Sequence, residues 1–211
     1  MVEEIVATVR LTQHELGKSA LDARVLQVLS TVPRHEFVPE SERAHAYDDR
    51  PLPIGAGQTI SQPFMVAIMT DLLDLKPEQV VFELGTGSGY QAAILSGLVK
   101  QVYTMEIIPT LGDQARQTLQ RLGYDNVSVR VGDGYDGWKE HAPFDAIIVT
   151  AATDHLPPPL LQQLKPGGRM ILPVGGNFLT QQLLLVTKAD DGSLRTRTIL
   201  PVRFVPLTGG R

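Results

Sequence analysis

A glycine-rich turn and two acidic residues near the middle of the chain have the types and spacing of a nucleoside-binding site. The turn 85–89 reads Gly-Thr-Gly-Ser-Gly and directly follows the apolar run 80–84. Glycines at such a turn let the backbone approach a ligand closely. Glu106 follows roughly 20 residues later, at the end of the next predicted strand, where an acid accepts hydrogen bonds from ribose hydroxyls. Asp133 ends a third predicted strand, where its carboxylate could accept from an adenine amino group.

The spacing within this turn distinguishes between two classes of nucleoside ligand. It differs from Gly-x-Gly-x-x-Gly, whose backbone binds a pyrophosphate. The turn 85–89 also offers no Arg or Lys as a phosphate partner. S-adenosylmethionine, which has no phosphate, therefore fits better than a nicotinamide dinucleotide. Tyr135 and Lys139 have the Tyr-x-x-x-Lys spacing of short-chain dehydrogenases, but Gly137 interrupts the long helix that such a pair requires.

The elements that must position these residues predict a doubly wound α/β fold. Strands alternate with helices from residue 79 onward, and this pattern indicates a mostly parallel sheet with helices on both faces. The segments 183–188 and 194–200 flank an Ala-Asp-Asp-Gly-Ser turn, which predicts antiparallel strands at one edge of the sheet. The predicted parallel strands are 80–84, 102–106, 127–131, 146–149 and 170–174, and the predicted helices between them are 89–99, 109–122 and 157–164.

The N-terminal third of the chain predicts helices followed by a long irregular segment. Residues 3–30 have helical patterning, and Ser19 to Asp22 have the spacing of a capping box. Residues 31–62 show no periodicity and are rich in Pro and Gly. Loops of this length in a compact domain are commonly functional. Pro63 suits the first position of a helix that continues to about residue 73.

Seven segments combine into a set of motifs that extends along nearly the whole chain. The glycine turn and the Pro-Gly-Gly turn are common to many methyltransferases, whereas Gln-Thr-Ile-Ser-Gln-Pro and Val-Pro-Leu-Thr are more specific. Together the segments resemble the protein-L-isoaspartate O-methyltransferase family, with a Rossmann-like methyltransferase fold. The chain carries Phe64 and Val66 where some members have histidine. The segments are 32–38, 46–54, 57–63, 83–89, 132–134, 164–175 and 204–208.

The resemblance implies an activity, a cofactor and a partner. The enzyme would transfer the methyl group of S-adenosyl-L-methionine, giving S-adenosyl-L-homocysteine, to the free α-carboxylate of L-isoaspartyl residues in damaged proteins and peptides. The methyl ester would then convert through a succinimide to a normal aspartyl residue. The biological role implied is protein repair.

The resemblance also implies roles for individual residues. Ser61 falls on the family's active-site serine, and Thr208 falls on a threonine that closes over the site. The substrate-binding positions implied are Gln58, Thr59, Ile60 and Ser61. The cofactor-binding positions implied are Glu83, Gly85, Thr86, Gly87, Gly89, Glu106, Asp133, Gly134 and Thr208.

The implied chemistry needs alignment more than acid–base catalysis. A carboxylate with a pKa near ~3.9 is already ionised at neutral pH, so no general base is required. Holding two reactants in attack geometry can account for roughly 7–11 kcal/mol of a barrier. Thr59 and Ser61 offer hydroxyl donors to orient the carboxylate, just before a helix whose N-terminus favours an anion by roughly 0.3–1 kcal/mol. The five histidines are scattered and show no catalytic or metal-binding spacing.

Composition excludes several classes of protein. The 211 residues contain no cysteine, which excludes disulfides, thiolate nucleophiles and cysteine-ligated metals. The net charge of −4 argues against a nucleic-acid partner. No apolar run approaches the ~20 residues of a membrane span, and the acidic start lacks a signal-peptide pattern. We therefore expect a cytoplasmic monomer with no membrane association.

We expect one domain over residues 1–211, divided into a helical and substrate-loop extension at 1–78, a cofactor-binding core at 79–175, and antiparallel edge strands and a tail at 176–211.

Two other readings remain open at this point. One is another class of S-adenosylmethionine-dependent methyltransferase, acting on a small molecule or an RNA. The Asn/Asp-Pro-Pro-Tyr motif of amino methyltransferases is absent, since Ala151 to Asp154 follow the fourth predicted strand. The other reading is a non-catalytic protein that binds S-adenosylmethionine.

Overall fold

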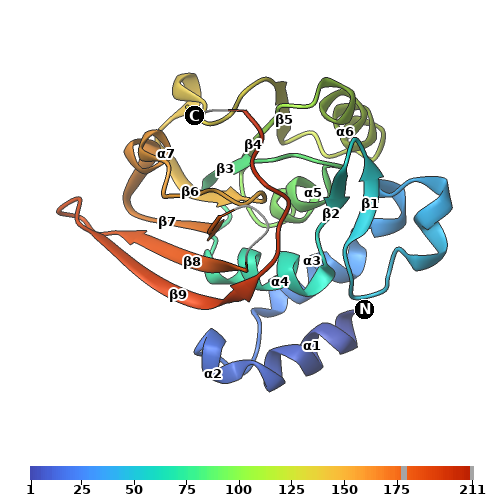
Figure 1. The fold of residues 1–211 in the computed structure, drawn as a ribbon, viewed down its shortest axis with the longest axis horizontal. Helices are drawn as coiled ribbons and strands as arrows, with labels where there is room; N and C mark the ends of the chain where they lie inside the picture. Colours follow the sequence, from blue (N-terminus) through green and yellow to red (C-terminus); the bar gives the residue numbers. More distant parts are fainter. Residues whose placement is uncertain (177–179, 210–211) are drawn as a thin grey trace.

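The computed structural model describes residues 1–176 and 180–209, and within them a seven-stranded sheet forms the centre of the molecule (Figure 1). The strand order is β5-β4-β3-β6-β7-β8-β9. The first five strands are parallel, and β8 pairs antiparallel with both β7 and β9. This arrangement confirms the predicted fold class. The strands are β3 (Val80–Leu84), β4 (Gln101–Glu106), β5 (Val127–Val131), β6 (Phe144–Val149), β7 (Leu164–Val174), β8 (Gln181–Lys188) and β9 (Leu194–Val202).

The side chains of the central strands alternate between two hydrophobic cores, one on each face of the sheet. Val81 packs into one core and its neighbour Phe82 into the other, and Ile148 and Ile147 divide in the same way. This alternation is the period of two expected for extended chain. Because both faces are covered, the central strands are apolar along nearly their whole length.

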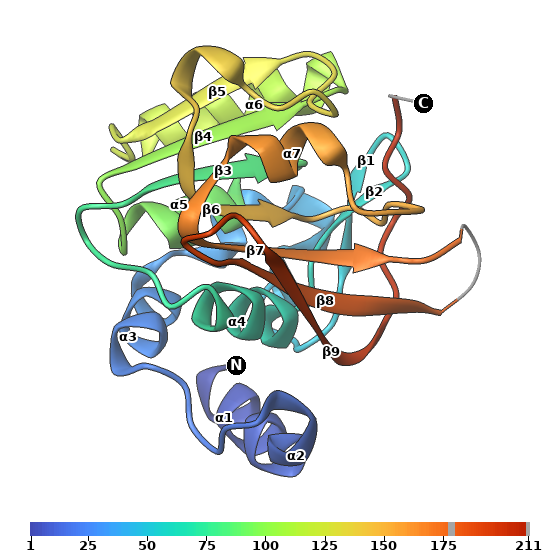
Figure 2. The same cartoon turned by 90° about the vertical axis from the view of Figure 1, so that its left-hand side faces the viewer.

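Helices cover both faces of the sheet, as predicted. Residues of the helices α3 to α6 belong to the core on one face, and Leu160 of α7 belongs to the core on the other. Figure 2, in which the left-hand side of Figure 1 faces the viewer, shows α7 in front of the sheet, with α4 and the N-terminal helices toward the lower end of the view. No helix in the described parts of the chain is long and apolar enough to cross a membrane. The helices after residue 62 are α4 (Pro63–Leu72), α5 (Tyr90–Ser96), α6 (Pro109–Arg121), the 3₁₀ helix η3 (Lys139–His141) and α7 (Pro158–Gln163).

The N-terminal helices differ in detail from the expectation. They are α1 (Val2–Leu11), α2 (Gln13–Leu16) and α3 (Ala23–Thr31), with a break between α2 and α3. The predicted capping box is wrong, because Asp22 is itself the N-cap of α3 and accepts the Arg24 N–H at 2.8 Å. The buried carboxylate of Asp71 on α4 accepts the Asp22 N–H at 2.6 Å and pairs with Lys18. These contacts fix the break against α4.

The irregular segment 31–62 contains more structure than its sequence indicates. It forms the 3₁₀ helices η1 (Arg34–Phe37) and η2 (Glu40–His45) and a two-stranded hairpin of β1 (Leu52–Gly55) and β2 (Gln58–Ile60). The hairpin turn has positive φ at Ala56 and Gly57, which is the geometry of a type I′ turn. Alanine is unusual at such a position, so the turn lacks the Asn-Gly or Asp-Gly signal that would have predicted it.

The contact between α6 and the sheet leads to a stability prediction for Gly112→Ala. Alanine in place of glycine usually stabilises an exposed helix by about 1 kcal/mol. A Cβ at Gly112, however, would lie 2.7 Å from Val131 Cγ2 and 3.3 Å from Glu106 Cβ. Overpacking of this kind costs about 1–3 kcal/mol. We therefore expect Gly112→Ala to have a lower free energy of unfolding than wild type, as measured by urea denaturation. Gln117→Ala, on the exposed side of α6, is the control. A more stable Gly112→Ala protein would contradict the packing.

Candidate functional site

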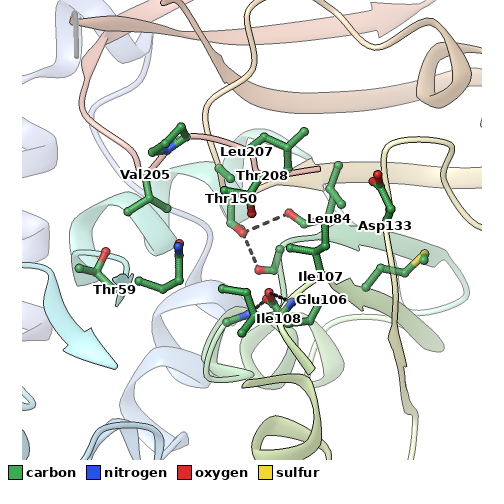
Figure 3. Close-up of a pocket in the computed structure, with 17 residues that line it drawn as sticks. Thr59, Leu84, Glu106, Ile107, Ile108, Asp133, Thr150, Val205, Leu207 and Thr208 are labelled. Carbon is green, nitrogen blue, oxygen red and sulfur yellow. Dashed lines mark hydrogen bonds between the residues drawn. The ribbon is translucent and has the colours of Figure 1, made fainter. Parts of the chain in front are cut away.

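A cavity of about 540 Å³, including its open mouth, lies at the carboxyl ends of β3, β4 and β6 (Figure 3). Parallel α/β sheets bind ligands at this edge, at the point where the strand order reverses. Here that point lies between β3 and β6, because the chain continues from β3 to β4 on one side and from β6 to β7 on the other. The hairpin β1–β2 and the tail after β9 complete its walls. The cavity, called the first cavity below, brings together eight of the residues that the sequence predicted: Gln58, Thr59, Gly85, Gly87, Glu106, Asp133, Gly134 and Thr208.

The glycine turn forms the floor of the first cavity. Gly85 has a φ of +99°, and a Cβ there would lie 2.5 Å from Thr150 Oγ1. The Thr150 hydroxyl donates to the Gly85 carbonyl at 2.6 Å, as Figure 3 shows. Both the backbone conformation and this close approach require glycine. Thr86 and Gly89 do not line the first cavity. The Thr86 hydroxyl hydrogen-bonds with the Thr104 hydroxyl, and Gly89 is the N-cap of α5.

Glu106 fastens the glycine turn to the end of β4. Its Oε2 accepts the Gly87 N–H at 2.7 Å and its Oε1 accepts the Ile108 N–H at 3.0 Å. The residue is only 6% exposed, yet it borders the first cavity. A carboxylate has about four lone-pair sites, so these two bonds leave capacity for a ligand hydroxyl.

Asp133 and Gly134 form the wall at the end of β5. The Asp133 side chain is exposed, and its Oδ1 accepts the Tyr135 N–H at 2.9 Å. A Cβ at Gly134 would collide with Leu84 and Met105, so this position also needs a residue without a side chain. Gly209 approaches Ile107 and Asp133 closely, which brings the tail to this wall.

Glu83 does not line the first cavity, although the sequence placed it among the cofactor-binding positions. Its side chain is fully buried in β3. Within residues 1–176 and 180–209, neither of its carboxylate oxygens has a hydrogen-bond partner. Burial raises the pKa of Glu83 to about 8, and the nearby Glu106 carboxylate adds to the increase. Glu83 is therefore mostly protonated at neutral pH.

A second cavity of about 1310 Å³, including its open mouth, adjoins the first. The two share Thr59, Thr150 and Val205, so these three residues mark the junction between them. Ser61 and Phe64 line the second cavity and not the first. Ile60 and Val66 are buried and line neither cavity. The second cavity is also lined by Thr8, Pro51, Gln62, Met65, Thr180, Leu200, Pro201, Val202, Arg203 and Phe204.

The N-terminus of α4 is already occupied by a carboxylate of the protein itself. Asp49 Oδ1 accepts the Phe64 N–H at 2.8 Å, and its Oδ2 accepts from Gln62 Nε2 at 3.1 Å. The expectation of free N–H groups at this helix end is wrong for Phe64, because Asp49 already accepts from this N–H and places its own carboxylate at the helix N-terminus.

Arg34 holds the segment that carries Ser61. Its side chain is fully buried, its Nε donates to the Ala46 carbonyl, and its Nη2 donates to the Ser61 carbonyl, both at 2.8 Å. Its guanidinium lies 4.7 Å from the centre of the Tyr90 ring at the start of α5. Burial lowers the pKa of Arg34 to about 10, so the side chain stays cationic at neutral pH.

The tail after β9 is a wall common to both cavities. The Ala152 N–H donates to the Val205 carbonyl and the Leu207 N–H to the Ala152 carbonyl, both at 2.8 Å. These bonds hold residues 205–207 beside the end of β6, and Figure 1 shows the tail, in red, crossing the sheet edge. Thr208 is exposed at the rim of the first cavity.

Sequence reasoning missed several lining residues. Thr150 follows the fourth predicted strand and Ile107 follows Glu106, so their positions at strand ends could have identified them. Thr8 and Arg203 had no such signal, because α1 and the end of β9 reach the second cavity only through tertiary packing.

The buried Glu83 gives a pH-dependent prediction. In the folded protein its pKa is about 8, whereas the unfolded chain has a value near 4.5, so the folded state retains a proton that the unfolded state releases. Stability contributed by the protonated group is therefore lost as the pH rises from about 4.5 to about 8. Glu83→Gln removes this titration. We expect the melting temperature of the variant, relative to wild type, to increase between pH 5 and pH 8.

The control is Glu78→Gln, which removes one negative charge at an exposed position. Melting curves of wild type and Glu83→Gln that shift in parallel across this pH range would contradict a buried, protonated Glu83.

Comparison with known proteins places these features in a family. The sequence model described as protein-L-isoaspartate(D-aspartate) O-methyltransferase (PCMT) matches residues 9–211. Protein-L-isoaspartate O-methyltransferase 2 of Syntrophobacter fumaroxidans is 65% identical over 210 residues, covering 100% of this chain and 85% of the relative. The protein of the same name in Polaromonas is 64% identical over the full length of both chains.

Solved structures agree with the sequence relatives. A structure described as protein-L-isoaspartate O-methyltransferase has a TM-score of 0.85 and 29% identity, with 99% of this chain matched to 66% of that one. A Plasmodium falciparum structure, described as a beta-aspartate methyltransferase in complex with S-adenosyl-L-homocysteine, has a TM-score of 0.78, 25% identity and 97% coverage of both chains. The chain belongs to the protein-L-isoaspartate(D-aspartate) O-methyltransferase family.

Proposed function

We propose that this protein transfers the methyl group of S-adenosyl-L-methionine to the free α-carboxylate of L-isoaspartyl residues in proteins and peptides. Family membership supports the reaction, and one structural observation carries it. The cavity lined by the glycine turn and the strand-end acids meets a larger open cavity at Thr59, Thr150 and Val205, and Ser61 lines the larger one. A small donor and a bulky peptide acceptor can thus reach one another from opposite sides.

The walls of the first cavity fit S-adenosylmethionine, which supplies a methyl group on a cationic sulfonium. Among the described residues that line this cavity, none is Lys or Arg, and two are acids. A positively charged ligand without phosphate suits this charge pattern better than a dinucleotide does. Glu106 would bind the ribose hydroxyls, and Asp133 the adenine end. The Gly85 and Gly87 backbone would border the remainder of the donor.

The buried Glu83 would act on the donor indirectly. It lies in β3 just before the glycine turn, and its neutral form adds no second negative charge near Glu106. Thr86, Gly89 and Ile60 would likewise support the walls from outside the first cavity, whereas Gln58 and Thr208 would contact the ligand at its rim.

The acceptor carboxylate needs orientation at the junction. Among the described lining residues of the two cavities there is no histidine, which agrees with a reaction that needs no general base. Thr59 and Ser61 would donate hydrogen bonds to the carboxylate. Positioning of the two reactants can account for roughly 7–11 kcal/mol of the barrier. A donor that stabilised the anion more than the transition state would slow the reaction, so neutral hydroxyls suit the role.

The methyl ester makes the damaged site reactive. Methoxide is a better leaving group than the oxide of a free carboxylate, so the following backbone amide nitrogen can attack the ester carbonyl and release methanol. The succinimide that forms then takes up water, and part of it becomes normal aspartyl peptide. These steps need no residue of this protein, which explains how repair follows from a single methyl transfer.

We further propose that the protein works as a single-domain cytoplasmic monomer without a nucleic-acid or membrane partner. The net charge of −4 supports the absence of nucleic acid. The single-domain organisation is supported by one hydrophobic core that contains Ile5, Val81 and Val202, from all three expected segments of the chain.

The reaction is tested by transfer of a labelled methyl group to an isoaspartyl peptide and to its aspartyl twin. We expect label in the isoaspartyl peptide only, as an ester that base removes. Equal labelling of both peptides, or no transfer to either, would overturn the proposal. Label that resists base would indicate methylation of another group.

Ser61→Ala tests the orientation role. A hydrogen bond to a charged group contributes about 1.5–3 kcal/mol, so turnover should fall by about tenfold to a hundredfold. No new pH dependence should develop near neutrality, because Ser61 abstracts no proton. Steady-state rates between pH 6 and pH 8 measure both effects. Ser30→Ala, on the exposed side of α3, is the matched control. Unchanged turnover in Ser61→Ala would remove Ser61 from the mechanism.

A further inference from the structure

The second cavity contains a positive charge that the methyl-transfer chemistry does not use. Arg203 is the one charged side chain among the described residues that line this cavity. The side chain is exposed, and within the described parts of the chain no hydrogen bond or ion pair holds it. Arg203 therefore brings a guanidinium, with its five N–H donors, to the border of the space in which the peptide would bind.

The position of Arg203 along the tail determines what it can reach. Val205 lies at the junction of the two cavities, and Arg203 precedes it by two residues. Two residues of chain span at most about 7 Å. An extended peptide advances about 3.3 Å per residue. The Cα of Arg203 therefore lies within about two peptide residues of Val205 at the junction, so its side chain can reach the residues that flank the reacting carboxylate.

The chemistry favours pairing of Arg203 with a neighbouring carboxylate of the peptide rather than with the carboxylate that reacts. A full positive charge on the reacting carboxylate would stabilise the nucleophile more than a transition state in which its charge is diminishing. Binding energy from a non-reacting part of a substrate carries no such penalty. Arg203 borders the second cavity and not the first, in which the donor would bind. Its charge can thus bind a carboxylate on a peptide residue that flanks the reacting one.

We propose that Arg203 is a specificity-determining residue that selects isoaspartyl peptides carrying a second carboxylate. This carboxylate would be an Asp or Glu side chain within two positions of the isoaspartyl residue, paired with the guanidinium at the cavity wall. The inference rests on the proposed function, whose reaction supplies the assay. It concerns which damaged segments are methylated most efficiently.

The experiment compares isoaspartyl peptides that differ at one flanking position. Glu, Gln or Lys is placed one or two residues before or after the isoaspartyl residue, and kcat and KM are measured for wild type, Arg203→Gln and Arg203→Glu. For wild type we expect kcat/KM to be about twofold to fivefold higher with Glu than with Gln at one or more positions, mainly through KM. This range corresponds to an exposed ion pair, and raised salt should reduce it.

The variants should change the ratio between peptides. Arg203→Gln should equalise the Glu and Gln peptides, and Arg203→Glu should favour the Lys peptide. Because each ratio is measured within one protein, a change in folding or cofactor binding cancels from it. Arg195→Gln removes a charge from an exposed position of β9 outside both cavities, so it should keep the wild-type ratio.

Three results would overturn the inference. They are a wild-type protein that does not distinguish the Glu and Gln peptides, an Arg203→Gln variant that keeps the wild-type ratio, and an Arg195→Gln variant that loses it. Failure of the proposed function would look different, because wild type would then methylate none of the isoaspartyl peptides.

Discussion

The cleft depends on a buried guanidinium that joins its two sides. Arg34 donates to the carbonyls of Ala46 and Ser61 and packs over Tyr90, the residue that begins the helix after the glycine turn. It therefore links the segment of the acceptor site to the helix of the donor site. The side chain is fully buried and cationic, so loss of either carbonyl acceptor would leave more of its donors unsatisfied in the core, which is costly. One residue thus keeps both sites in fixed relation.

The charges of the two cavities suit their proposed occupants. The first is bordered by the acids Glu106 and Asp133 and the second by Arg203, among the described residues. A cationic donor and an anionic acceptor would each meet the opposite charge. Neutral side chains, those of Thr59, Thr150 and Val205, separate these regions at the junction. The same polarity would disfavour exchange of the two ligands between cavities.

Local sequence patterns predicted the sheet, the glycine turn and the acids at the strand ends. Their positions follow from the strand period and from the rule that ligands bind at the carboxyl ends of parallel strands. Features set by distant contacts were not predictable in this way. The contact of Arg34 with Ser61, the use of Asp49 at the N-terminus of α4, and the approach of Arg203 to the second cavity all depend on contacts beyond local sequence. The hairpin turn at Ala56 was missed because its residue type is atypical.

The central claim is that donor and acceptor occupy adjoining cavities at the same time and react directly at the junction. Initial rates measured over a grid of S-adenosylmethionine and isoaspartyl-peptide concentrations test it most directly. Direct transfer within a ternary complex predicts double-reciprocal lines that intersect. Parallel lines would show that the methyl group passes first to the protein and the donor product leaves before the peptide binds. That result would contradict the account.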